Sequence, residues 1–425
     1  MSTISSSLLY QIPSSAALKA QYVGQKLKDI QAPAAIIDLA VVKKNCNLML
    51  EAAESLKVQF RAHVKTHKTS ELAQLQAGES GPVRLILAHV LGSSKHISLM
   101  VDHVETLSFI SRSSPLWPGG PIRIFVKIDT GYHRSGVTFD SSQLNAISTA
   151  LSKPETKEQI SLLGLYSHLG HSYAFNTPTE AIQGLLTELT SLAKATTTIQ
   201  QTHGPLVLSV GATPTATAAQ TLSSPSPLTD PAQKETADSL HTHLSHLKSK
   251  GLIPELHAGV YPVLDMQQLA THSRTTNLTP SDIGLTILAE VSSLYPDRAT
   301  PEALISAGSL VLGREPCKSY PGWGVVTPWP EPTTIANPTS PPPHYSEASK
   351  TGWIVGRVSQ EHGILTWQSP TGSPVSRELV IGQKVMIWPN HACVAGSGFG
   401  WYFVVDSESG DGDVVRDVWV RCRGW

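Results

Sequence analysis

The residue whose type and placement point most directly to chemistry is a lysine between two histidines. Lys65 lies between His63 and His67 and directly follows an apolar run that predicts a strand. Burial at such a position would lower the pKa of the ammonium group, and a neutral amine can attack a carbonyl carbon. Lys65 is therefore a candidate to form a Schiff base with pyridoxal phosphate (PLP) or with a substrate carbonyl. The alternative is a solvated Lys/His loop between a strand and a helix.

A second candidate pair, His391 and Cys393, lies far downstream. If this segment is a strand, both side chains point to one face, because residues i and i+2 of a strand share a face. An imidazole and a thiolate suit zinc better than magnesium or calcium. Two protein ligands leave room for water or substrate, as in a catalytic site. The alternative is a buried cysteine beside a loop histidine.

Further strand ends carry groups suited to a phosphorylated, aromatic cofactor. Arg134, in a glycine-bounded turn, could donate hydrogen bonds to a phenolate oxygen or a carboxylate. The small and hydroxyl residues of segment 209–215 would let backbone amides approach a phosphate. Tyr173 closes a segment rich in His and Tyr and is a candidate contact for the cofactor ring. Each of these residues could instead be structural.

These candidates need a scaffold that gathers strand ends, and residues 31–285 predict one. Eight short apolar runs alternate there with helical patterns, which predicts a (β/α)8 barrel with its chemistry at the carboxyl ends of the strands. Asp38 is the expected cap of the first helix. The predicted strands cover residues 34–37, 60–64, 83–88, 104–107, 122–128, 160–166, 206–210 and 255–260.

The hydrophobic pattern of the sequence changes after residue 285. Short alternating runs separated by turn residues predict an antiparallel β domain over residues 286–425, which would carry the metal pair. Residues 1–30 are expected to form an N-terminal extension that packs on this domain. The predicted fold class is thus α/β plus β. Two stretches rich in Thr, Ser and Pro, 212–233 and 327–349, are predicted to be surface loops.

Composition restricts the class of protein. A chain of 425 residues with 40% hydrophobic and 15% charged residues is typical of a soluble globular protein with more than one domain. A formal net charge of −1 argues against a nucleic-acid partner. Four widely spaced cysteines predict a reducing compartment. The sequence shows neither a membrane-spanning run nor a signal peptide, so a cytoplasmic location without a membrane partner is expected.

Taken together, the motifs resemble those of the eukaryotic zinc-dependent D-serine dehydratases. These enzymes belong with the D-threonine aldolases among the alanine-racemase-like, fold-type III PLP enzymes. The resemblance covers residues 20–405, and the lysine and His-x-Cys motifs are specific when they occur together. The motifs are RAHVKTHK (61–68), DTGYHRSG (129–136), SVGATPT (209–215), GVY (259–261), SQEHG (359–363) and PNHAC (389–393).

The resemblance implies an assignment for each candidate. Lys65 would be the Schiff-base lysine and would take the α-proton, and zinc on His391 and Cys393 would assist loss of the β-hydroxyl. The expected reaction converts D-serine, a small D-amino acid, to pyruvate and ammonia, and the expected assembly is a homodimer. The residues implied to surround the PLP phosphate are Ser209, Gly211, Thr213, Gly259 and Tyr261.

Other functions stay open on the sequence. A D-threonine aldolase would cleave the Cα–Cβ bond, but its metal pair usually resembles His-x-Asp, so Cys393 favours the dehydratase. An amino-acid racemase needs a second base on the opposite face of the cofactor, and none is identified. A PLP carrier with a single barrel would need neither the β domain nor zinc. Departures from the family pattern at residues 306–310 and 257–258 leave the exact substrate and the partner of the pyridine nitrogen open.

Overall fold

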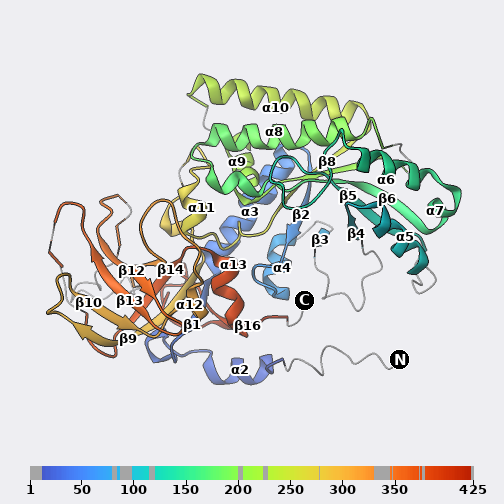
Figure 1. The fold of residues 1–425 in the computed structure, drawn as a ribbon. Coiled ribbons are helices and arrows are strands. Elements are labelled where there is room, and N and C mark those ends of the chain that lie inside the picture. The colour runs from blue at the N-terminus through green and yellow to red at the C-terminus, as the bar shows by residue number, and fades with distance from the viewer. Residues whose placement is uncertain are drawn as a thin grey trace.

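The structure is a computed structural model, in which two regions stand side by side (Figure 1). One is a parallel sheet covered by helices, and the other is a closed antiparallel barrel. The predicted α/β plus β class is confirmed. Among the described helices, none combines the length and the apolar character needed to cross a membrane. The described residues are 12–78, 84–86, 98–113, 120–199, 204–223, 228–276, 278–329, 345–346, 348–372, 374–375 and 379–422.

The first region is built on a sheet of seven parallel strands in the order β3-β2-β8-β7-β6-β5-β4. The carboxyl ends of these strands lie at one edge of the sheet, as the barrel prediction requires. The strands are β2 (Gln59–His63), β3 (Arg84–Ile86), β4 (Ser98–Val101), β5 (Ile122–Lys127), β6 (Ile160–Tyr166), β7 (Val207–Val210) and β8 (Ile253–Ala258).

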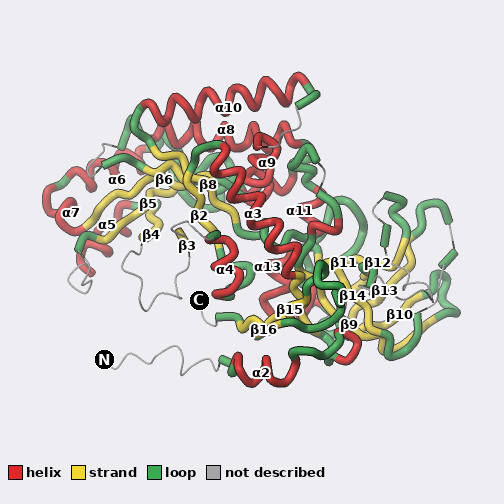
Figure 2. Tube along the Cα trace, turned by 180° about the vertical axis from the view of Figure 1, so that it is seen from behind, coloured by secondary structure: helices red, strands yellow, loops and turns green. Residues whose placement is uncertain are grey.

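Helices cover the outer face of this sheet. Helix α10 lies outermost, over α8, in both views (Figures 1 and 2). Helix α8 begins at a capping box in which Thr177 and Glu180 each accept from the other's backbone N–H. The helices are α3 (Leu39–Ser55), α4 (Ser70–Ala77), α5 (Val104–Ser113), α6 (Ser142–Ser152), α7 (Pro154–Gln159), α8 (Pro178–Ala195), α9 (Thr213–Ser223) and α10 (Pro231–Ser249). Helix α11 (Met266–Ala270) packs instead in a cluster with Tyr320 and Ile354 of the other region.

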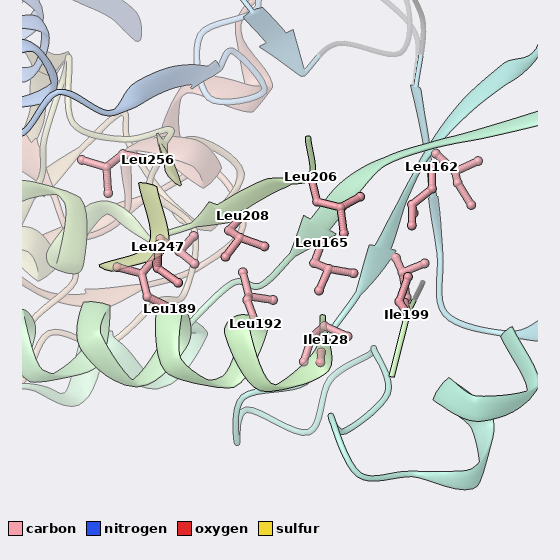
Figure 3. Close-up of a cluster of buried hydrophobic side chains, with 14 of the residues drawn as sticks. Ile128, Leu162, Leu165, Leu189, Leu192, Ile199, Leu206, Leu208, Leu247 and Leu256 are labelled. Carbon is pink, nitrogen blue, oxygen red and sulfur yellow. The ribbon is translucent and has the colours of Figure 1, made fainter. Parts of the chain in front are cut away.

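The core of this region lies between the sheet and α8. Leu165 of β6 and Leu208 of β7 face Leu189 and Leu192 of α8, and all four are at most 1% exposed (Figure 3). Truncation of such a fully buried leucine to alanine costs about 2–5 kcal/mol of stability. This packing fixes α8 behind the ends of β6 and β7, where the candidate site begins.

Two predicted strands differ from the structure. Residues 104–107 open helix α5, because the buried Leu107 and Ile110 recur at helical rather than strand spacing. The strand of this unit is β4, just upstream. The first predicted strand is β1 (Ala34–Asp38), and it pairs with strands of the antiparallel region rather than with the parallel sheet. Its apolar run, residues 34–37, suits any strand that is buried on both faces, so the pattern could not distinguish between the two sheets.

The predicted surface loop at 212–233 is largely wrong. Residues 213–223 form helix α9, and most of its side chains are buried because Ala and Thr are small enough to pack closely against the sheet. Residues 231–233 begin α10, and residues 224–227 lie outside the described residues. The second predicted loop, 327–349, has residues 330–344 outside the described part of the chain.

The second region is a nine-stranded sheet in which β9, β10, β13, β12, β11 and β14 close into a barrel. Strands β1, β15 and β16 extend this sheet from β9. Helix α2 (Ser15–Tyr22) packs on β16, where Lys19 forms an ion pair with Asp417 at 2.7 Å. The strands are β9 (Leu285–Tyr295), β10 (Glu302–Ile305), β11 (Gly324–Val326), β12 (Gly352–Val358), β13 (Gly363–Gln368), β14 (Lys384–Pro389), β15 (Trp401–Val405) and β16 (Asp417–Val420).

Candidate active site

Lys65 lies two residues beyond the carboxyl end of β2, as the sequence predicted. Its side chain is exposed, between the buried Val64 and Thr66. The chain itself therefore does not provide the desolvation that the sequence argument assumed for Lys65. The neighbouring His67 is structural: its Nε2 donates to Gln76 and its Nδ1 accepts from a backbone N–H, which fixes the turn into α4. Burial lowers the pKa of His67 to about 4.

Near Lys65, four aromatic side chains at the ends of β2, β6 and β8 form a stacked layer. Tyr166 and His257 lie with their ring centroids 4.3 Å apart and nearly parallel, and His63 stacks on His257 at 4.7 Å. His168 stacks on both His63 and His257. Burial lowers the pKa of each of the three histidines, so they are neutral near pH 7. This histidine–tyrosine layer forms the floor of the site.

Lys65 and Arg134 both lie close enough to this floor for their charges to act on it. After burial, the charge of Arg134 is the largest influence that lowers the pKa of His168, and that of Lys65 follows. Arg134 is exposed, and its guanidinium lies over the ring of Tyr132 at 5.4 Å. The structure thus places the predicted lysine and arginine near the same histidine.

The loops after β7 and β8 are adjacent, as the phosphate-site prediction requires, because these two strands pair. Gly211 has a φ of +136°, and a Cβ there would lie 2.3 Å from the carbonyl oxygen of His257, so only glycine fits. Thr213 opens helix α9, and its Oγ1 accepts from the backbone N–H of Val260 at 3.0 Å. A glycine loop that leads into a helix N-terminus suits a phosphate group.

Three of the residues predicted to surround the phosphate, Ser209, Gly259 and Tyr261, are engaged in other contacts. Ser209 Oγ contacts His257 Nδ1 at 3.0 Å within the floor. Gly259 backs onto His63, whose Cβ would lie 3.1 Å from an added Cβ. Tyr261 is 2% exposed and packs edge-on against Phe60, and burial followed by the nearby Cys46 raises the pKa of its hydroxyl. The Tyr261 ring therefore belongs to the apolar core beside the site.

His391 and Cys393 lie in a turn and not in the strand that the spacing argument assumed. Strand β14 ends at Pro389, and His391 caps the short helix α13 (Ala392–Ala395). The two side chains are still neighbours, and the hydrogen bond between them affects the pKa of His391. Burial lowers the pKa of His391, but the hydrogen bond to Cys393 and the charge of Asp265 outweigh it and raise that pKa to about 9.

Hydrogen bonds to residues 265–267, Glu315 and Gly322 hold this metal-pair turn. His391 Nδ1 donates to Gln267 Oε1 at 2.6 Å, which directs Nε2 away from Gln267. The buried Asp265 accepts from the backbone N–H of Ala392 at 2.8 Å. The side chain of Asn390 donates to two backbone carbonyl oxygens. Within the described part of the chain, no group of three or more His, Cys, Asp or Glu side chains is placed to hold a metal.

One contact joins the two halves of the site. Thr66 Oγ1 lies 3.0 Å from Cys393 Sγ, and Thr66 directly follows Lys65. Tyr173 lies on the same side: its ring is 6.2 Å from that of His391, and burial followed by Cys393 raises the pKa of its hydroxyl. Tyr173 therefore lies beside the metal-pair turn. Helix α13 lies between the two regions in both views (Figures 1 and 2).

The sequence argument missed one buried carboxyl near the floor, Glu188 of α8. Its Oε1 accepts from Ser167 at 2.9 Å, and Ser167 Oγ lies 2.7 Å from Thr130 Oγ1. Burial raises the pKa of Glu188 to about 8, although hydrogen bonds from Ser167 and from the Gly211 and Leu169 backbone oppose this shift. The amphipathic pattern of α8 could not reveal it, because a single Glu on a helix is usually solvated.

Comparisons with known proteins identify two matching families and similar relatives. Residues 284–405 match the family "Putative serine dehydratase domain", and residues 87–225 match "Alanine racemase, N-terminal domain". D-serine dehydratase of Schizosaccharomyces pombe is 32% identical over 451 aligned positions, which cover 96% of this chain and 95% of the relative. D-serine dehydratase of Saccharomyces cerevisiae is 29% identical and covers 95% and 99% respectively.

A solved structure shares the fold. A Cys-to-Ala mutant of D-threo-3-hydroxyaspartate dehydratase, in the metal-free form, superposes with a TM-score of 0.68 at 24% identity. The match covers 94% of this chain and 100% of that protein. The alanine-racemase-like arrangement of a parallel-sheet region beside an antiparallel β region is therefore shared along nearly the whole chain.

Proposed function

The chain belongs to the D-serine dehydratase family, and from that premise we propose that it dehydrates D-serine to pyruvate and ammonia with PLP and zinc. The observation that carries the proposal is the contact between Thr66 and Cys393. It supports a single site formed by a lysine at a strand end and a His/Cys pair from the other region, because Thr66 directly follows Lys65. The reaction removes a proton from the α-carbon and a hydroxyl from the adjacent β-carbon of the substrate. It therefore needs a base near the first atom and a Lewis acid near the second.

The residues at the sheet mouth fit PLP. Lys65 would hold it through the ε-amine, and the glycine loop at Gly211 that leads into the N-terminus of helix α9 would receive its phosphate. Arg134 could bind its phenolate oxygen or the substrate carboxylate. When bound, PLP supplies an electron sink for the charge left by the departing α-proton.

The side chains of the protein would transfer the proton and set the charge around the substrate. Lys65 is exposed near the floor, and we assign its amine as the base that would accept the substrate α-proton. The floor histidines stay neutral because burial lowers their pKa. They therefore add no positive charge that would compete with Lys65 and Arg134 for anionic groups of the substrate.

The metal-pair turn fits zinc. Gln267 accepts from Nδ1 of His391, which leaves Nε2 as the ligand atom, and Thr66 can donate a hydrogen bond to the Cys393 thiolate. When bound, zinc supplies a Lewis acid for the departing β-hydroxyl. The metal-free form of the related dehydratase mutant supports a metal in that relative and, by its shared fold, supports the proposal here. Homodimer formation and a cytoplasmic location stay predictions.

The test is product analysis with two substrates. The purified, PLP-loaded protein is incubated with D-serine and with D-threonine, with and without a chelator. We expect pyruvate and ammonia from D-serine, lost on chelation and restored by zinc. Glycine and acetaldehyde from D-threonine, without pyruvate from D-serine, would instead assign the protein as an aldolase and would contradict the proposal.

A further inference from the structure

An arginine near the end of the described chain bridges the two halves of the site. Arg421 follows β16 and is 6% exposed. Its Nε donates to the carbonyl oxygen of His67 at 3.1 Å. Its Nη1 donates to the carbonyl oxygens of Ser397 at 2.9 Å and Phe399 at 3.1 Å. One planar guanidinium therefore bonds two backbone segments at once.

These two segments carry the groups proposed to do the chemistry. His67 lies two residues after Lys65, and the segment 397–399 follows helix α13, which contains Cys393. The backbone of the same C-terminal segment adds two further bonds. The N–H of Arg421 donates to Gly400 at 3.0 Å, and that of Cys422 donates to Lys68 at 2.7 Å.

The chemistry of this contact suits a geometric role. In the described residues, no carboxylate lies within ion-pair distance of Arg421, and carbonyl oxygens accept its side-chain bonds. A buried guanidinium is tolerated when such bonds compensate for lost hydration. Because its donors have a fixed planar geometry, the guanidinium sets the separation of the two loops that it joins.

A second set of contacts leads back to the lysine. The guanidinium lies 5.7 Å from the ring centroid of Tyr402, and the Tyr402 hydroxyl donates to the carbonyl oxygen of Thr66 at 3.5 Å. Thr66 in turn contacts Cys393. Arg421 is thus linked to the lysine loop both directly, at His67, and through Tyr402.

We propose that Arg421 is a positioning residue that holds the Lys65 loop and the metal-pair turn in register for the reaction. This inference rests on the proposed function, because it assumes that both groups act on one substrate. Displacement of catalytic groups by about 1 Å can lower a rate by about 10²-fold. Loss of Arg421 should therefore lower kcat and kcat/KM together, as expected for a contact that acts in the transition state.

The test compares Arg421→Ala and Arg421→Lys with the matched control Arg416→Ala. Arg416 lies just before β16, but its side chain is exposed and contacts Ser409 and Asp411. All proteins are loaded with PLP and zinc and assayed on D-serine well below their unfolding temperature. Folded fraction, cofactor absorbance and zinc affinity by chelator competition are measured on the same samples.

We expect Arg421→Ala to lower kcat about 10- to 100-fold and to weaken zinc binding about tenfold, with the cofactor absorbance retained. Added guanidinium ion should restore part of kcat in this variant, whereas urea should not. Arg421→Lys should fall between Arg421→Ala and the wild type, because a single ammonium cannot reproduce the planar fork. Arg416→Ala should match the wild type.

Wild-type kcat and zinc affinity in folded Arg421→Ala would overturn the inference. A loss of activity that only follows the folded fraction, without guanidinium rescue, would overturn it too. If Arg421→Ala does not fold, the inference depends on Arg421→Lys: a wild-type rate and wild-type zinc affinity in that variant would overturn it. Failure of the proposed function is a separate outcome, because the wild type would then make no pyruvate. The chelator competition for zinc needs no turnover, so it would still test the role of Arg421.

Discussion

The mouth of the parallel sheet and the metal-pair turn hold their residues in different ways. At the mouth, the candidate groups follow β2, β5, β6, β7 and β8, and each strand is fixed by ladder hydrogen bonds to its neighbours. The metal-pair turn is one short excursion after β14, held by single contacts from Asp265, Gln267 and Thr66. Many backbone hydrogen bonds thus hold the strands of the sheet, whereas a few side chains hold the turn. Substitution of one of these side chains should therefore disturb the turn and leave the sheet intact.

The largest effect is expected at the mouth, from Lys65→Ala. Activity should fall by about 10³-fold or more, because the variant loses both the covalent link to PLP and the base. Absorbance spectroscopy should show loss of the Schiff-base band. Lys68→Ala is the control and should keep the band, since the amine proposed to form the Schiff base is that of Lys65. A Schiff-base band that survives in Lys65→Ala would move the assignment to another lysine.

Cys393→Ala should separate the two halves of the site. Without the thiolate, the variant should lose zinc and about 10²-fold or more in pyruvate formation, but it should keep the Schiff-base band of Lys65. Metal analysis and the absorbance spectrum of one sample check both results. Cys317→Ala, a change at a buried cysteine that contacts Met266 and Ser319, should keep zinc. D-serine dehydration by Cys393→Ala at the wild-type rate would rule out this role for the metal pair.

A smaller effect confined to the turn is expected from Gln267. Gln267→Met removes the oxygen that accepts from His391 Nδ1 and should weaken zinc binding about 10- to 100-fold. Gln267→Glu retains an acceptor and should bind zinc more tightly than Gln267→Met. Competition with a chelator measures both affinities. Equal zinc affinity in the two variants would mean that Gln267 does not orient His391.

The smallest effect on activity is expected at Glu188, where the readout is stability against pH. Its pKa is about 8 in the folded protein, against an ordinary value of 4.5. The unfolded chain therefore releases this proton first, so the stability that Glu188 contributes is present below pH 4.5 and is lost as the pH rises to about 8. Glu188→Gln should remove this loss. Urea unfolding across that range compares the two, and parallel curves would contradict a raised pKa.

The sequence predicted best where the chemistry follows a regular local pattern. Lys65 and the loops after β7 and β8 lie at strand ends because alternating strand and helix patterns fix where each strand stops. The His391/Cys393 pair was found from residue chemistry alone, and its predicted backbone was wrong. A strand and a turn can both bring residues i and i+2 together, so spacing could not distinguish them.

Long-range contacts had no local signal. Thr66 and Cys393 are 327 positions apart, and His67 and Arg421 are 354 apart, so no periodicity links them. The pairing of β1 and the burial of α9 also had no local signal in the sequence. An apolar run shows that a strand is buried but not which sheet it joins, and a Thr/Ala-rich helix has the composition of a loop.

The pairing of β1 with β9 and β15 also sets an order of events during synthesis. Strand β1 is made before both neighbours: it can pair with β9 only after residue 295 has been made and with β15 only after residue 405. The strands of the parallel sheet all lie between these partners in sequence and can associate earlier. We expect a nascent chain to display an apolar strand with two open edges, a species that chaperones protect from aggregation. A chain truncated before residue 391 would hold Lys65 without the metal pair, so dehydration would begin only after Cys393 has been made.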